Sequence, residues 1–244
     1  MATLEVAIRR CGYASQPSPQ AGRSLRRFRL IESGTRVVKR VVAASRALAR
    51  EAQRAGERLH HRRRARRAHQ AIERAGPIRS VLFMCHGNVC RSPFAEVVFA
   101  QRMQALQAAP VAASSAGFIG PNRQPPPQAL ATAGLRGADL SNHRSTVITG
   151  SIAVEADLIV VMAADQAAAM NRRFPRIHAP VLVLGDFDPL PIITRTIRDP
   201  WGCDDAVFAA SYDRISRCVT ELAAAVATAN RLSSERTTEP SDKS

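Results

Sequence analysis

One short segment constrains the fold more than any other part of the chain. Val81-Leu82-Phe83-Met84 is an uninterrupted apolar run, and it passes directly into the turn Cys85–Ser92. Pro93 then stands at the start of a helical pattern. Short apolar runs are typical of strands buried on both faces, and proline is favoured at the first helical position. The order strand, turn and helix predicts one unit of a parallel sheet covered by helices.

The same alternation continues along the chain after this unit. Further apolar runs lie at 110–116, 157–162 and 180–184, and helical patterns lie near 126–135, 146–154, 164–173 and 204–230. Strands that alternate with helices predict the α/β class, here a doubly wound four-stranded parallel sheet. In such a sheet ligands bind at the carboxyl ends of the strands, where the turn Cys85–Ser92, called here the cysteine loop, is expected to lie.

The charge is divided unequally along the chain. Residues 1–78 hold 19 of the 35 Lys and Arg residues and 5 of the 20 Asp and Glu residues, which leaves about one excess positive charge for residues 79–244. We expect residues 1–30 to be disordered and 31–78 to form a basic helical extension that ends at Gly76-Pro77. Residues 79–230 form the α/β domain in this interpretation, and the polar residues 231–244 a disordered tail.

Composition excludes several classes of protein. No apolar stretch reaches 18 residues, so no transmembrane segment is expected. Five cysteines, an odd number in a chain of this length, predict free thiols in a reducing compartment, hence a cytoplasmic protein. The six histidines show no metal-ligand spacing. We therefore expect neither a metal nor another cofactor.

The cysteine loop has the residues that an anion site requires. Backbone N–H groups at a helix N-terminus bind a tetrahedral anion, and Gly87 and Asn88 tolerate the tight backbone that such a loop needs. Arg91 can bind two phosphate oxygens through its planar fork. The same groups favour the thiolate of Cys85, which makes it a nucleophile toward phosphorus, and Ser92 can donate to it. The expected phosphate-binding residues are His86, Gly87, Asn88, Val89, Cys90, Arg91 and Ser92. The alternative is a plain turn between buried thiols.

The segment Val81–Glu96, V-L-F-M-C-H-G-N-V-C-R-S-P-F-A-E, closely resembles the signature of the low-molecular-weight protein tyrosine phosphatases, and the bacterial branch in particular. The resemblance extends over about residues 79–222. The other matching segments are Ser114–Gly117, Asn142–Ser145, Ala156–Met162, Val183–Pro189 and Arg198–Gly202. It implies a hydrolase that removes phosphate from phosphotyrosine through a phosphocysteine intermediate.

This resemblance also assigns roles outside the loop. Asp199 corresponds to the general acid that protonates the leaving phenolate and then activates water, so the catalytic residues are Cys85, Arg91 and Asp199. The residues expected to support the loop are Ser92, Asn88, Ser115 and His143. Trp201, where the family often has tyrosine, and His86, where it often has an uncharged residue, are expected to form the substrate pocket.

Two related activities remain as alternatives. Protein arginine phosphatases tend to carry threonine at the position of Val89, whose aliphatic side chain favours phosphotyrosine. Arsenate reductases of this fold need a further close cysteine pair, whereas Cys203 and Cys218 are fifteen residues apart. Cys90 also has two interpretations: a packed thiol, or, as the family implies, a partner for a reversible disulfide with Cys85.

Partners follow from both parts of the chain. The resemblance implies a phosphotyrosine-containing protein as substrate, with a bacterial tyrosine kinase as one candidate. The basic residues 36–75, above all Arg62–Arg67, could contact an anionic surface such as nucleic acid or a membrane face. A solvated helix, a mis-assigned start codon or an organelle transit peptide would also account for the extension.

Overall fold

The computed structural model describes residues 45, 51, 55–56 and 59–238. The disorder expected for residues 1–30, most of the first half of the basic extension and the last six residues lie outside this part of the chain. No helix among the described residues is long and apolar enough to span a membrane.

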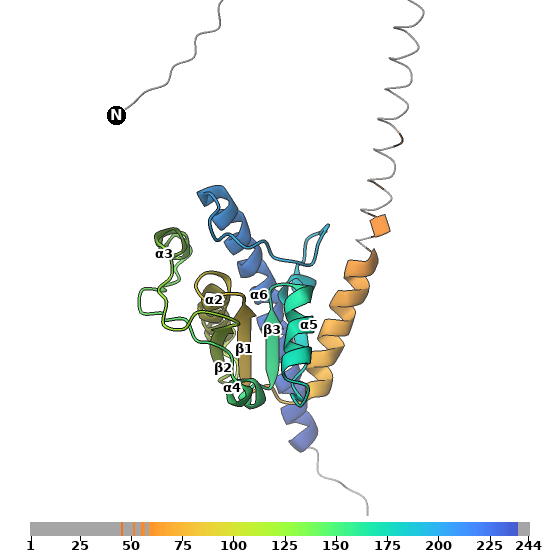
Figure 1. The fold of residues 1–244 in the computed structure, drawn as a ribbon. Coiled ribbons are helices and arrows are strands. Elements are labelled where there is room, and N and C mark those ends of the chain that lie inside the picture. Colours follow the sequence, from red (N-terminus) through yellow and green to blue (C-terminus); the bar gives the residue numbers. More distant parts are fainter. Residues whose placement is uncertain (1–44, 46–50, 52–54, 57–58, 239–244) are drawn as a thin grey trace, which may run out of the picture. The chain divides into compact units, whose positions relative to one another are not determined.

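The elements alternate in the order that the sequence predicts (Figure 1). They are β1 (Ser80–Cys85), α2 (Arg91–Ala105), β2 (Ala112–Gly117), α3 (Pro127–Gly134), α4 (Gly150–Glu155), β3 (Leu158–Val161), α5 (Ala164–Arg173), β4 (Val181–Val183), the 3-10 turn η1 (Leu184–Phe187) and α6 (Asp205–Thr238). Helix α4 begins later than the predicted 146, because Thr149 caps it by accepting a hydrogen bond from the Ile152 N–H at 3.3 Å.

The sheet is parallel throughout and has the order β2-β1-β3-β4. The predicted doubly wound, four-stranded architecture is therefore confirmed. From β1 the chain crosses first to β2 on one side and then to β3 on the other, so the direction of winding reverses at β1. Cys85 is the last residue of β1 and lies at this switch point, where open α/β sheets bind their ligands.

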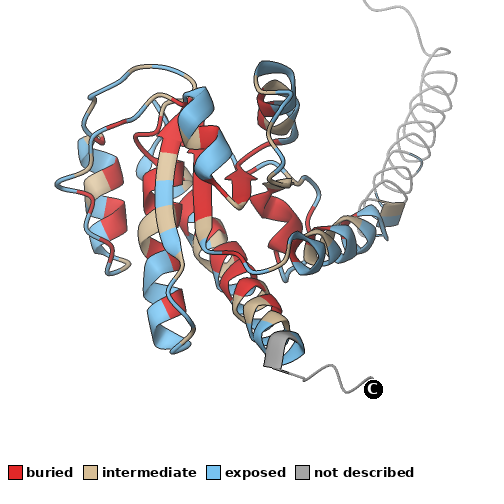
Figure 2. Ribbon diagram, turned by 90° about the horizontal axis from the view of Figure 1, so that it is seen from below, coloured by how far each residue is buried: buried red, intermediate tan, exposed pale blue. Residues whose placement is uncertain are grey.

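Alternate side chains of β1 supply two separate cores. Val81 and Phe83 belong to the core shared with α2 and α6, and Leu82 and Met84 belong to the core shared with α4 and α5. Burial on both faces explains why the strand is apolar without interruption. Figure 2 shows the buried residues gathered in the sheet and on the inner sides of the surrounding helices.

Residues 59–75 form a helix that is part of this packing (orange in Figure 1). Ala68 and Ile72 are buried in the α2–α6 core, and the His69 ring lies 5.2 Å from that of Phe187. The predicted helix is present over these residues, but it is more than a basic appendage. The face opposite its exposed arginines packs against the α/β domain.

Helix α6 differs from its predicted end. It continues to Thr238, whereas the sequence predicts a disordered tail from residue 231. Near that boundary, the Asn230 side chain donates to the Ile78 carbonyl and accepts from the Ile78 N–H, both at 2.8 Å. This pair of hydrogen bonds holds the segment before β1 against α6. The helix continues beyond Asn230, so the polar composition of residues 231–238 did not indicate where it ends.

Candidate active site

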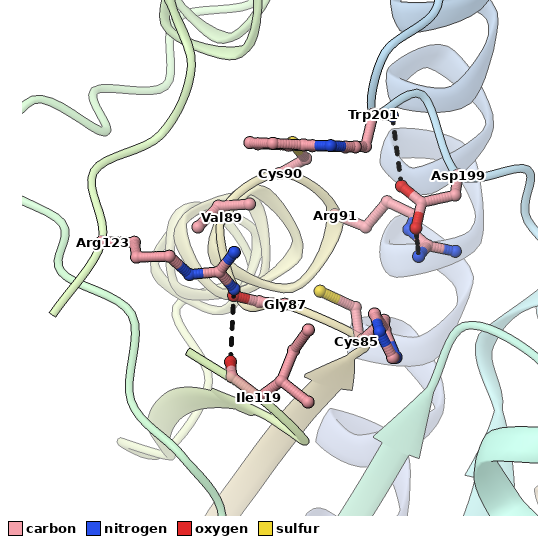
Figure 3. Close-up of a pocket in the computed structure, with 10 residues that line it drawn as sticks. Cys85, Gly87, Val89, Cys90, Arg91, Ile119, Arg123, Asp199 and Trp201 are labelled. Atoms are coloured by element: carbon pink, nitrogen blue, oxygen red, sulfur yellow. Dashed lines mark hydrogen bonds and ion pairs between the residues drawn. The ribbon is translucent and has the colours of Figure 1, made fainter. Parts of the chain in front are cut away.

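The cysteine loop connects β1 to α2 and holds the Cys85 sulfur between two donors. The Asn88 N–H lies 3.2 Å from Cys85 Sγ, and Ser92 Oγ donates to it at 3.1 Å. Cys85 is buried in the sheet end, and its side chain points into a cavity (Figure 3). Two donors therefore hold the sulfur in place at the cavity.

Asn88 holds the loop in shape. It is fully buried and has a φ of 50°, a left-handed conformation that asparagine tolerates better than most residues. Its Nδ2 donates to Ser92 Oγ at 2.9 Å and to Ser115 Oγ at 2.8 Å, and its Oδ1 accepts from the Thr146 N–H at 2.8 Å. His143 Nε2 lies 2.8 Å from the Asn88 carbonyl. All four predicted supporting residues thus belong to one network.

Arg91 is the only charged residue of the loop, and it is 4% exposed. Its Nη1 donates to the Ile197 carbonyl at 3.1 Å, and its Nη2 forms an ion pair with Asp199. Its Nε is buried and has no hydrogen-bond partner among the described residues. A buried guanidinium donor without a partner is costly, and it marks the place where an anion would be stabilised.

The loop forms the floor of a cavity of about 320 Å³. The cavity is lined by Cys85, His86, Gly87, Val89, Cys90, Arg91, Ile119, Arg123, Asp199 and Trp201. Asp199 Oδ1 accepts from the Trp201 N–H at 3.2 Å, and the Trp201 ring is 56% exposed at the rim (Figure 3). The structure therefore brings the predicted nucleophile, arginine, acid and pocket residues to one place, and His86 lines it as an exposed residue.

Cys90, the other cysteine of the loop, lies in a different environment from Cys85. Burial raises the pKa of the Cys90 thiol to about 12, and the charge of Cys85 acts in the same direction. The Tyr212 hydroxyl donates to the Cys90 carbonyl at 3.0 Å, and its ring stacks on Phe94 with 4.1 Å between centroids. Cys90 is consequently a neutral thiol at physiological pH, and both Cys85 and Cys90 are free.

Arg123 is a cavity residue that sequence reasoning missed. Its Nη2 donates to the Gly87 carbonyl at 2.7 Å, and its Nε donates to the Gly120 carbonyl at 3.0 Å. A Cβ atom at Gly87 would lie 2.7 Å from Arg123 Nη2, so glycine leaves room for the guanidinium. The arginine adds positive charge at the mouth of the cavity. Its loop of Gly and Pro residues carries no pattern that singles it out.

Glu96 was also missed as a neighbour of the supporting network. Burial raises its pKa, against the opposing effects of a hydrogen bond with Ser115 and the charge of His143. Glu96 comes from α2, Ser115 from β2 and His143 from the segment before α4. Three separate elements therefore meet behind the loop.

Comparison with known proteins gives a consistent result. A family model described as low molecular weight phosphotyrosine protein phosphatase matches residues 80–232. A probable low molecular weight protein-tyrosine-phosphatase, EpsP of Ralstonia nicotianae, is 32% identical over 143 residues, which are 58% of this chain and 92% of that protein.

Solved structures share the fold. The tyrosine phosphatase Wzb from Escherichia coli K30, in complex with sulphate, has a TM-score of 0.54 and 24% identity, and the match covers 60% of this chain and 97% of that one. The YwlE arginine phosphatase of Bacillus subtilis, with a phosphorylated active-site serine, has a TM-score of 0.57 and 24% identity over 63% and 99% of the two chains. At this level of identity the likeness shows the fold alone.

Proposed function

The chain belongs to the low molecular weight phosphotyrosine protein phosphatase family, and we propose that it hydrolyses phosphotyrosine in proteins with Cys85 as the nucleophile. One observation carries this proposal above the others. The Cys85 sulfur, the buried Arg91 guanidinium and the Asp199 carboxyl group line one cavity at the carboxyl edge of the sheet. A cysteine nucleophile, an anion-binding fork and a proton donor are the groups that phosphate monoester hydrolysis needs.

The first step transfers the phosphoryl group to the enzyme. The Cys85 thiolate attacks phosphorus, an S–P bond forms and the P–O bond to the tyrosine ring breaks. Arg91 and the loop N–H groups bind the phosphoryl oxygens, where negative charge must be stabilised. Protonated Asp199 gives its proton to the departing phenolate oxygen, because a strongly basic phenolate is a poor leaving group unless it is protonated as it leaves.

The second step regenerates the thiolate. Asp199, now a carboxylate, takes a proton from water as the water oxygen attacks phosphorus. The S–P bond breaks, inorganic phosphate forms and the electron pair returns to sulfur. The Ser92 hydroxyl, 3.1 Å from the sulfur, supports the leaving thiolate in this step. Neither step as written uses a metal ion or an organic cofactor.

The pocket walls favour an aromatic ester over its two competitors. Val89 presents an aliphatic side chain to the cavity, and the Trp201 ring stands at the rim, where it can pack against a phenyl group. Arsenate reduction of this type requires a further thiol that can form a disulfide with the reacting cysteine. Cys218 is fully buried in the core, and burial raises its pKa to about 12, which makes it unsuited to such a relay.

We also propose partners for the two parts of the chain. The substrate is a phosphotyrosine-containing protein, and a bacterial tyrosine kinase is one candidate. The helix 59–75 exposes Arg62, Arg63, Arg66 and Arg67 on the side away from Ala68 and Ile72. This strip could add contact with an anionic surface, which high salt would weaken.

The test is hydrolysis of phosphotyrosine and of an aryl phosphate in EDTA by the full chain. Cys85→Ser should abolish turnover of both, and Cys11→Ser, the same exchange at a cysteine before the segment 80–232 that the family model matches, should leave it intact. Phosphoarginine and arsenate serve as competing substrates. Turnover that survives in Cys85→Ser, or an enzyme active on phosphoarginine or arsenate but inactive on phosphotyrosine, would overturn the proposal.

A further inference from the structure

Asp186 is a buried carboxylate outside the catalytic cavity that two arginines reach from different elements. It lies in η1, directly after β4, and is 4% exposed. Arg64 of the helix 59–75 places its Nε 3.6 Å from Asp186 Oδ1, and Arg195 forms a close ion pair with the other oxygen. Asp186 therefore connects this helix to the segment 188–204, the Asp199 loop, which carries the proposed general acid.

The same helix makes a second contact with the start of that loop. His61 is buried, and its Nε2 lies 2.8 Å from the Asp188 carbonyl. Ala68 and Ile72, about two and three turns further along, anchor the helix in the core. The helix lies before the segment 80–232 that the family model matches, so these contacts are additions to the family domain.

From Arg195 onward the Asp199 loop is held at nearly every residue. A Cβ atom at Gly185 would lie 2.0 Å from the Arg195 carbonyl oxygen, so the two backbones are in close contact. Arg214 donates to the Thr194 and Thr196 carbonyls, the Ile197 N–H to the Met162 carbonyl, Arg91 to the Ile197 carbonyl and Ser211 to the Arg198 carbonyl. Arg195 therefore lies on the same anchored segment as Asp199, four residues before it.

We propose that Arg64 and Asp186 are positioning residues, through which the helix 59–75 braces the Asp199 loop so that the acid faces the leaving group. The inference rests on the proposed function. A buried carboxylate with charged partners seldom adds net stability compared with apolar packing, but it specifies geometry. The geometry specified here is the path of the loop that carries the acid.

Substrates with different leaving groups distinguish a misplaced acid from a loss of folded enzyme. kcat/KM includes only the steps up to departure of the phenolate, and proton donation accelerates that departure most when the phenol is weakly acidic. Tyrosine has a phenol with a pKa of about 10, whereas a dinitrophenol leaves readily without a proton. A misplaced Asp199 lowers kcat/KM for phosphotyrosine much more than for a dinitrophenyl phosphate. A smaller fraction of folded enzyme lowers both equally, so the ratio of the two values reports the position of the acid.

The experiment compares Arg64→Met and Asp186→Asn in the full chain, with Arg74→Met as control because Arg74 is exposed on the same helix. Arg64→Met and Asp186→Asn, the two bridge variants, should each lower the ratio of kcat/KM for phosphotyrosine to kcat/KM for the dinitrophenyl phosphate by about tenfold. A displacement near 1 Å costs up to about 100-fold. The double variant should shift it no further than one single variant. Arg64→Lys, which keeps the charge, should restore part of the ratio, and Arg74→Met should not change it.

Asp199→Asn in the same assay separates the two proposals. A large shift of the ratio in Asp199→Asn together with a wild-type ratio in both bridge variants would refute the brace and leave the proposed function standing. Absence of any shift in Asp199→Asn would remove the acid itself, and the brace with it. Equal losses on both substrates in the bridge variants would assign Arg64 and Asp186 to stability alone.

Discussion

Replacing Asn88 by alanine should damage stability and catalysis together, because one side chain shapes the whole cysteine loop. The exchange removes three side-chain hydrogen bonds of 2.8–2.9 Å, to Ser92, Ser115 and Thr146, of which the first is buried and the other two are partly buried. At about 1 kcal/mol each, their loss lowers the free energy of unfolding by about 3 kcal/mol. The φ of 50° adds about 1 kcal/mol, because alanine tolerates the left-handed region poorly. The expected total is about 4 kcal/mol.

Urea unfolding measures this loss, and Asn88→Gly divides it into its two parts. Glycine loses the same hydrogen bonds but accepts the positive φ, so it should be about 1 kcal/mol more stable than the alanine variant. Both variants should lose about 100-fold or more in kcat/KM on an aryl phosphate, because the loop loses the side-chain hydrogen bonds that place its backbone N–H and Ser92 against the sulfur. Unfolding free energies within 1 kcal/mol of wild type for both variants would refute the role given to Asn88.

Other predictions concern reactivity, acid stability and close packing. With its pKa near 12, Cys90 should resist iodoacetamide at pH 7 while Cys85 reacts, and mass spectrometry of the labelled peptides would show the reverse order if this is wrong. Burial opposes ionisation of Asp188, but hydrogen bonds and charges from two arginines of α6 outweigh it and lower its pKa. Its stabilising effect is therefore complete above the unfolded value of about 3.9 and fades as pH falls through the lower folded value, so Asp188→Asn should cost more in urea at pH 7 than at pH 2. Gly117→Ala should reduce kcat/KM, because its Cβ would lie 2.8 Å from a backbone nitrogen of the cysteine loop, whereas Gly134→Ala meets nothing within 4 Å and should not; equal activities would contradict this.

The parts of the fold that the sequence predicted are those where local pattern and tertiary packing agree. The run Val81–Met84 is apolar because β1 is covered on both faces, and Pro93 sits in the first turn of α2. Such signals need no knowledge of distant residues. The cysteine loop was predictable for the same reason: Cys85, Gly87 and Arg91 are close together in the chain and lie between a strand signal and a helix signal.

The residues that were missed depend on contacts between segments far apart in sequence. Arg123 reaches Gly87 across 36 residues, and Arg64 reaches Asp186 across 122. A single arginine in a loop or on a basic helix has no local signature that distinguishes it from solvated neighbours. The tail prediction was wrong for residues 231–238, because polar composition describes the surface of α6 and carries little information about where the helix ends.

The basic extension shows how charge can mislead when it is considered without periodicity. Arg62, Arg63, Arg66 and Arg67 suggest a solvated helix, yet Ala68 and Ile72 on its other side enter the main core. Burial of the Ile72 side chain contributes about 2 kcal/mol to holding this helix on the domain. Arg64 lies between the exposed and the buried face of the helix and forms an ion pair with the buried carboxylate of Asp186. Residues 59–75 therefore pack as part of the folded domain.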